Sequence, residues 1–253
     1  GVVLFALVAV VASVAVAFLG VGVFSKTFLP WQLSANQYAT IVMGLTALYV
    51  VAGGMYSVGF TDVLQFILLT IASLAVGLIA MSKVSGEAIA AATPVHWDTL
   101  RFGWGLGLDW NEKMPAAMDA IKNDGYVLFA PFVAMALLKG LLSSVAGPTP
   151  GYDMQRVLAA KDDREASLMS GIVSLVLFVP RYFLIGGITA LALVFYSDVL
   201  RGQAQPNYEQ ILPYVIENFI PVGLTGILLA GLFSAFMSTF DSTVNSGAAY
   251  LVI

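Results

Sequence analysis

Seven polar side chains interrupt an otherwise apolar helical pattern near the end of the chain. The stretch FSAFMSTFDSTVNSGAAY, residues 233–250, continues an apolar run, yet between Met237 and Gly247 it holds one carboxylate, one amide and five hydroxyls. At 3.6 residues per turn, these side chains and their neighbours fall into two adjacent stripes. One stripe contains Ser234, Ser238, Asp241 and Asn245, and the other contains Ala235, Thr239, Ser242 and Ser246.

Oxygen atoms dominate both stripes. Hydroxyl, carbonyl and carboxylate oxygens are the ligands that alkali and alkaline-earth cations prefer, so the pattern predicts a weak, reversible Na⁺ site. The alternative is structural, because Ser and Thr also permit close helix packing or bond back to carbonyls of their own helix. That alternative accounts for Ser234 or Thr243, but it leaves the carboxylate of Asp241 unexplained.

The composition is typical of a membrane protein. Of the 253 residues, 59% are hydrophobic and 10% are charged, whereas a soluble domain has about 25% charged residues. The net charge of −4 argues against a nucleic-acid-binding protein, for which a basic face is typical. Cysteine is absent, which excludes a disulfide framework and a thiolate metal site. Because the chain starts at Gly1 inside an apolar run, we expect it to be a piece of a longer protein.

Six stretches are apolar enough to span a membrane, which takes about 20 residues per helix. They are Val2–Val23, Tyr38–Ala52, Val58–Met81, Tyr126–Ala146, Leu168–Phe195 and the segment from Pro221 to the end. A tight glycine turn separates the second and third spans. Residues 84–125 form a long polar excursion in which we expect short interfacial helices. The Lys and Arg bias of the short loops places the connector Arg156–Arg164 in the cytoplasm, and therefore residues 84–125 outside the cell.

Three more polar features lie in or beside these spans, where polar groups are costly and usually face a cavity or a pathway. Asp62 precedes the apolar run Val63–Ala80, so we expect it partly within the membrane, with a snorkelling or capping carboxylate as the alternative. The break GPTPG, residues 147–151, cannot continue a regular helix. Such a broken span lines a binding cavity in transporters, and an ordinary helix end is the alternative. Arg181, near the middle of its span, and Lys139 each need a partner, either a carboxylate of the protein or an anionic solute.

Three motifs together resemble the sodium:solute symporter family, which contains sodium–glucose, sodium–proline and sialic acid transporters. GGMYSVGFTDVLQ is similar to the family's segment on core helix 5, YDMQRVLAAKDDREA to the segment after core helix 6, and SAFMSTFDSTVNS to the segment on core helix 8. The resemblance implies an all-α integral membrane protein with part of the inverted-repeat core of five plus five helices. Residues 1–83 would then be core helices 3–5, residues 84–125 an extracellular loop, and residues 126–253 core helices 6–8.

The resemblance also implies where ligands bind. The main sodium site would take the Ala235 carbonyl and the hydroxyls of Ser238 and Thr239, together with a helix outside this chain. A second sodium site, as in some members, would combine Asp62 with Ser238, Asp241 and Ser242. Because Asp241 stands where sugar-transporting members tend to have a small residue, two sodium ions per cycle is a hypothesis.

The substrate residues of the sugar-transporting members do not transfer to this sequence. The corresponding region has Ser143, Ala146 and Gly147, and no Lys lies between Gly171 and Arg181. We therefore do not expect a hexose, and Arg181 suggests an anionic or zwitterionic solute. Asp241 is expected to be an ion ligand, and pairing of Asp241 with a buried cation such as Arg181 is the alternative.

The sequence therefore predicts sodium-coupled symport of a small organic solute by alternating access, with Na⁺ as the coupling ion. The expected partners are the solute, the lipid bilayer and the remaining helices of the full transporter, with no nucleic acid, and the expected location is the cell membrane. No nucleophile–base constellation, zinc motif or phosphate loop is present, so an enzyme is not expected. The rivals are an ion channel or membrane sensor, and an intramembrane aspartyl enzyme in which a second catalytic group faces Asp62 or Asp241.

Overall fold

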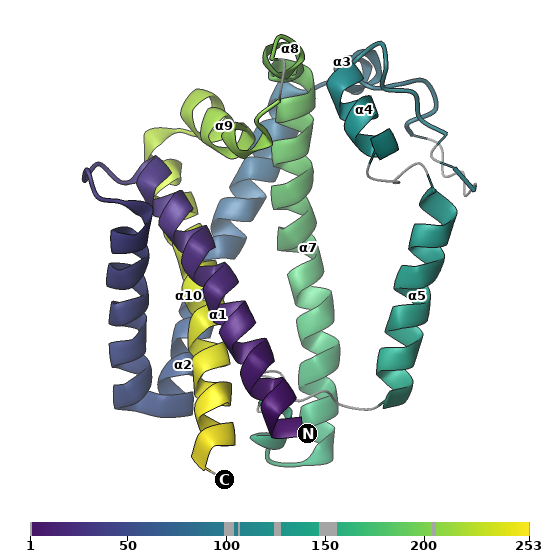
Figure 1. Ribbon diagram of the computed structural model, residues 1–253. Helices are drawn as coiled ribbons and strands as arrows, with labels where there is room; N and C mark the ends of the chain where they lie inside the picture. The colour runs from purple at the N-terminus through teal and green to yellow at the C-terminus, as the bar shows by residue number, and fades with distance from the viewer. Residues whose placement is uncertain are drawn as a thin grey trace. The chain divides into compact units, whose positions relative to one another are not determined.

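The structure is a computed structural model that describes residues 2–98, 104–105, 107–123, 128–146, 156–203 and 206–252. In these ranges every regular element is a helix (Figure 1). The helices are α1 (Val2–Phe28), α2 (Ala35–Lys83), α3 (Gly86–Ala92), α4 (Pro115–Asn123), α5 (Phe129–Ala146), α7 (Asp163–Phe195), α8 (Ser197–Arg201), the 3₁₀ helix η1 (Tyr208–Gln210), α9 (Ile211–Phe219) and α10 (Val222–Val252).

The long helices coincide with the six predicted spans. Four of them, α1, α2, α7 and α10, are long and apolar enough to cross a membrane, and α5 contains a shorter apolar stretch. Helix α2 contains the second and third predicted spans together. Two short helices, α3 and α4, lie in the polar excursion at residues 84–125, as expected from its sequence.

A single glycine divides α2 into two arms. Gly54 has φ 53° and ψ −143°, a conformation that is outside the helical region, accessible to glycine and strained for residues with a Cβ atom. Figure 1 shows α2 turning sharply within its length, so that the arm 55–83 leaves the turn in a different direction from the arm 35–53. Ser57 closes the turn, because its hydroxyl donates to the carbonyl oxygens of Tyr49 and Gly54. The predicted glycine turn is therefore confirmed.

The chain forms two compact units, and each takes segments from both halves of the sequence. The first unit comprises Gly1–Ala75, Thr149–Arg181 and Pro221–Ile253. In it α1 packs along α10, as the purple and yellow helices of Figure 1 show. The buried side chains between α1, α10 and the first arm of α2 are Ala17, Val21, Ala39, Met43 and Phe240. This packing fixes one face of α10 and leaves others for the polar stripes.

The second unit comprises Val76–Pro148 and Tyr182–Ile220. Its core joins the end of α2 to α7, α8 and α9 through Ala80, Leu191, Tyr196, Leu200 and Val215. Tyr196 and Tyr214 lie against each other with ring centroids 4.2 Å apart. This core is apolar, and the polar stripes of α10 belong to the first unit.

Candidate ion-binding site

Helix α10 runs antiparallel to the second arm of α2 at close range. A Cβ atom on Gly231 would lie only 3.1 Å from the Cα atom of Leu69, so the absence of a side chain at Gly231 permits this approach. Seven residues further along each helix, in opposite directions, Ser238 meets Asp62. Seven residues are about two helical turns, so the same faces meet at both points. The polar stripe of α10 is thereby directed at the polar end of this arm.

Asp62 lies at the centre of a group of hydrogen bonds. The Ser238 hydroxyl donates to its Oδ1 atom at 2.5 Å, and the Arg156 Nη2 atom donates to its Oδ2 atom, also at 2.5 Å. The same Nη2 atom donates to the Ser242 hydroxyl at 2.7 Å. The side chains of Arg156 and Asp62 are 29% and 22% exposed, so this ion pair is largely withdrawn from the surface.

Asp241 is fully buried beside this group. The Tyr49 hydroxyl, from the first arm of α2, donates to its Oδ2 atom at 2.6 Å, and the Ser242 hydroxyl donates to its Oδ1 atom at 3.2 Å. The relative exposure of Asp241 is 0%. A buried charge is tolerated only when hydrogen bonds or an opposite charge compensate it, and Tyr49 and Ser242 provide that compensation.

These contacts join into one continuous polar network. Its members, in order of contact, are Tyr49, Asp241, Ser242, Arg156, Asp62 and Ser238. Two carboxylates and one guanidinium leave one formal negative charge when all three are ionised. The network therefore offers carboxylate, hydroxyl and phenol oxygens around an uncompensated negative charge, which is an environment suited to a small hard cation.

The next residue of the same stripe continues the contact with α2. The Asn245 amide lies 3.5 Å from the sulfur of Met55, just beyond the Gly54 turn. Ser238, Asp241 and Asn245 therefore all face α2, as the helical spacing predicted. By contrast, Thr243 bonds back to the carbonyl oxygen of Thr239, which is the structural role expected as the alternative for that residue.

The residues implied for the main sodium site lie on an exposed side of α10. Ala235 and Thr239 are both exposed, and the Thr239 hydroxyl donates to the Ala235 carbonyl at 3.0 Å. Ser238, half-buried between them, is already bonded to Asp62. The structure thus brings Asp62, Ser238, Asp241 and Ser242 together through hydrogen bonds, and it shows no hydrogen bond between that group and the oxygens of Ala235 and Thr239, which bond to each other.

The residues suggested for substrate binding receive less support from the structure. Gly147 and the rest of the GPTPG break lie outside the described residues, as do the side chains of Ser143 and Ala146, so these assignments stay predictions. The backbone of α5 is helical up to Ala146. Arg181 follows Pro180 within α7 and is exposed. Among the described residues no carboxylate pairs with Arg181, and the hydrogen bonds of Asp241 come from Tyr49 and Ser242 instead.

Sequence reasoning missed two members of the network. Arg156 counts as a loop charge in the sequence, yet its guanidinium reaches Asp62 and Ser242. In the sequence Tyr49 is not distinguished from the apolar residues of its span, although its hydroxyl donates a hydrogen bond to Asp241. The sequence held one indication of these two residues. Asp62 and Asp241 lie in apolar spans, and a carboxylate in such a place needs hydrogen-bond donors from elsewhere in the chain. In the described part of the chain, buried side-chain oxygens of Gln65, Thr70 and Ser73 also have no hydrogen-bond partner and were not singled out from the sequence, whereas Ser246, which has none either, belongs to the second predicted stripe.

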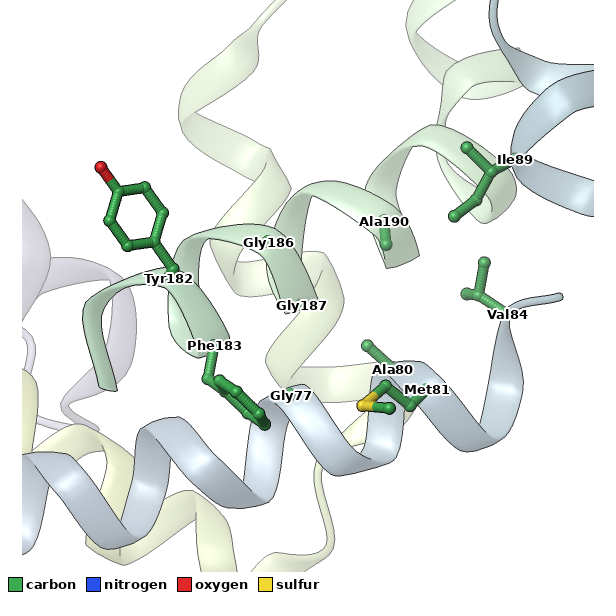
Figure 2. A pocket seen from close by; sticks show the side chains of 10 residues that line it. All are labelled: Gly77, Ala80, Met81, Val84, Ile89, Tyr182, Phe183, Gly186, Gly187 and Ala190. Carbon is green, nitrogen blue, oxygen red and sulfur yellow. The ribbon is translucent and has the colours of Figure 1, made fainter. Parts of the chain in front are cut away.

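A separate cavity of about 270 Å³ lies within the second unit (Figure 2). Its walls come from the end of α2, through Gly77, Ala80 and Met81, and from α7, through Phe183, Gly187 and Ala190. Figure 2 shows the Tyr182 hydroxyl, the one oxygen among the drawn side chains, directed away from the others. With an apolar lining the cavity offers no ligands to an ion. A transition-metal centre needs three or more His, Cys, Asp or Glu side chains close together. The described ranges contain no such group.

Comparison with known proteins decides the family. The model of the sodium:solute symporter family matches residues 2–253, which is nearly the whole chain. The chain belongs to this family. Sodium:solute symporters are integral membrane proteins, in agreement with the apolar helices. The resemblance seen in the three sequence motifs is therefore confirmed.

Curated members of the family resemble the chain at low identity. It is 25% identical to the sodium/myo-inositol cotransporter of Canis lupus familiaris over 89% of this chain and 34% of the relative. It is 24% identical to sodium/glucose cotransporter 4 of Danio rerio over 89% of this chain and 35% of that protein. The chain thus spans about a third of the length of the curated relatives that it matches.

A solved structure shows the same fold. A sodium-coupled sialic acid symporter, described in a substrate-bound outward-open state with a novel Na⁺ site, superposes with a TM-score of 0.69 at 20% identity. The match covers 98% of this chain and 49% of the symporter. The prediction of an all-α membrane fold of the symporter type is confirmed, whereas the assignment to core helices 3–8 stays a prediction.

Proposed function

We propose that this chain is part of a transporter that moves a small organic solute across a membrane together with Na⁺, by alternating access. The single observation that carries the proposal is the contact of Ser238 with Asp62, within a family whose curated relatives are named as sodium cotransporters. This contact joins the motif around Asp62 to the motif around Ser238, although the two residues are 176 positions apart in the sequence, and it lies in a cluster of hard oxygen ligands. Na⁺ is the coupling ion in this proposal.

The main sodium site in this proposal uses the Ala235 carbonyl and the hydroxyls of Ser238 and Thr239. Ala235 and Thr239 are exposed on α10 and their oxygens are 3.0 Å apart, so a second helix of the full-length protein has access to both. The second site uses Asp62, Ser238, Asp241 and Ser242. Ser238 belongs to both sites, so an ion at one site alters the ligand set available at the other.

The proposed arrangement in the membrane follows from the family and from the distribution of Lys and Arg in the short loops. Residues 1–83 supply core helices 3–5, residues 126–253 supply core helices 6–8, and residues 84–125 form an extracellular loop. The cell membrane is the proposed location, and the remaining helices of the transporter are the proposed partners. The chain carries no covalent chemistry in this proposal, because the curated relatives are named as cotransporters, and the carboxylates of the network are assigned to ion binding.

The solute is small and organic. The curated relatives are named for myo-inositol and glucose, and the neighbour of known structure for sialic acid. In this chain the proposed substrate residues are Ser143, Ala146 and Gly147 at the end of α5, with Arg181 as a positive charge for an anionic or zwitterionic solute. The test panel therefore includes polyols, hexoses, sialic acid, amino acids and carboxylates.

The central experiment measures solute uptake by the full-length protein in proteoliposomes, with an inward gradient of Na⁺ or of K⁺. We expect uptake of one solute class with Na⁺ only. The double variant Ser238→Ala/Thr239→Ala should raise the half-saturating Na⁺ concentration strongly, because it removes two of the three ligands supplied by α10. Thr27→Ala, which removes a hydroxyl that bonds only to its own helix, is the matched control. Equal uptake in K⁺, or an unchanged sodium curve in the double variant, would refute the proposal.

The second site has its own test. Two sodium ions per solute are expected, and Asp241→Ala should reduce the number to one while the main site still supports uptake. A measured stoichiometry of one in the wild type, together with unchanged sodium activation in Asp241→Ala, would exclude the second site.

A further inference from the structure

Arg156 occupies the position of a bound cation in the polar network. Its Nη2 atom lies 2.5 Å from Asp62 Oδ2 and 2.7 Å from Ser242 Oγ. Both oxygens belong to the set proposed for the second sodium ion. Distances of this size are those of short charge-assisted hydrogen bonds, so no second cation fits between the same two oxygens while the guanidinium is there.

We propose that Arg156 is a tethered competitor of Na⁺, which binds Asp62 and Ser242 when the second sodium ion is absent and must leave for the ion to enter. The inference rests on the proposed function, because it assigns a role within the proposed second site. It makes Arg156 a residue that determines ion affinity and stoichiometry, although Arg156 is not itself a ligand of the ion.

Charge explains why the two occupants would alternate. Arg156 joins Asp62 to Ser242, and Ser242 is bonded to Asp241, so without a cation two carboxylates would face one site in a largely buried environment. Like charges in such a place repel each other and are costly to desolvate. Arg156 offsets the repulsion between the carboxylates when the second sodium ion is absent, and Na⁺ offsets it when the ion is bound. In both states the site therefore holds one positive charge.

The surroundings of Arg156 allow the exchange. The next residues of the chain, Val157, Leu158 and Ala159, are exposed, and α7 begins only at Asp163. The Arg156 side chain is 29% exposed, so part of it is already in contact with the surroundings of the protein. Asp241 by contrast is fixed by Tyr49 from the neighbouring arm of α2 and has no exposed surface. In this proposal the exchange therefore moves the guanidinium of Arg156 and leaves Asp241 in place.

The experiment compares the sodium dependence of uptake, and Na⁺ binding to the purified full-length protein measured with ²²Na⁺, among four variants and the wild type. Arg156→Gln removes the competitor, and Arg156→Lys keeps a charge but has a compact, strongly hydrated head group. Asp62→Asn/Arg156→Gln removes the competitor together with its carboxylate. Arg164→Gln, an exposed arginine of the same connector, is the matched control.

Arg156→Gln should lower the half-saturating Na⁺ concentration by about tenfold or more, because a charge-assisted contact no longer has to be broken. Arg156→Lys should lower the half-saturating Na⁺ concentration by a smaller factor. If Arg156→Gln does not fold, the Arg156→Lys variant tests whether residue 156 competes with Na⁺. The gain should disappear in the double variant, and Arg164→Gln should match the wild type.

An unchanged or higher half-saturating concentration in the Arg156 variants would overturn the inference. Persistence of the gain in the double variant would overturn it as well, because the effect would not then act through Asp62. These results differ from failure of the proposed function, which appears in the wild type itself as uptake that does not depend on Na⁺.

Discussion

The hydrogen bond from Tyr49 to Asp241 can be tested by removing one atom. Tyr49→Phe deletes the hydroxyl and leaves the ring, so the loss is confined to a 2.6 Å contact that ends on a fully buried carboxylate. Hydrogen bonds between membrane helices average about 0.6 kcal/mol, whereas bonds to charged groups contribute about 1.5–3 kcal/mol. Because the acceptor is a buried carboxylate and only Ser242 remains to satisfy it, we expect the free energy of unfolding to fall by about 1.5–2 kcal/mol.

The measurement is an unfolding titration of the full-length protein in mixed detergent micelles, without Na⁺, followed by circular dichroism. Tyr56→Phe is the matched control, since the same atom is removed from a tyrosine of α2 that is 93% exposed. Its effect should stay within about 0.5 kcal/mol, as for other surface substitutions. Equal losses in the two variants, or no loss in Tyr49→Phe, would mean that Tyr49 does not hold Asp241 and that the network ends at Ser242.

Two further predictions concern the glycines that shape the site, each with a neighbouring glycine as control. Gly54→Ala should cost about 1–3 kcal/mol, because an alanine is strained at φ 53°, whereas Gly59→Ala, where a Cβ meets nothing within 4 Å, should be neutral or stabilising. A Gly54 variant as stable as the Gly59 variant would contradict the turn. Gly231→Ala should cost about 1–3 kcal/mol and weaken Na⁺ binding, because its Cβ would press on the Leu69 backbone, whereas Gly226→Ala should do neither. Wild-type Na⁺ affinity in Gly231→Ala would show that the close approach is not needed for the site.

The sequence by itself determined the helices and the polar face of α10. Continuous apolar runs of about 20 residues are typical of membrane helices, because a helix satisfies its backbone hydrogen bonds within one segment, whereas the strands of a membrane barrel are shorter and alternate between apolar and polar residues. The glycine pair at residues 53–54 predicted the turn inside α2, since a positive φ is accessible there. The spacing of Ser238, Asp241 and Asn245 predicted that the three side chains share one face, and they do.

Only the tertiary structure decided what that face meets. Helical periodicity states which residues of a helix lie together, but it carries no information on which face of another helix they approach. Tyr49 and Asp241 are 192 residues apart, and Arg156 reaches Asp62 across 94 residues. Arg156 in particular lies in a stretch of charged residues that reads as a connector, and its long side chain carries the charge away from its own backbone position. The donors that bond to the carboxylates of Asp62 and Asp241 follow from how the helices pack, because the absence of a side chain at Gly231 lets α10 approach α2, and the turn at Gly54 brings Tyr49 back toward the second arm of α2.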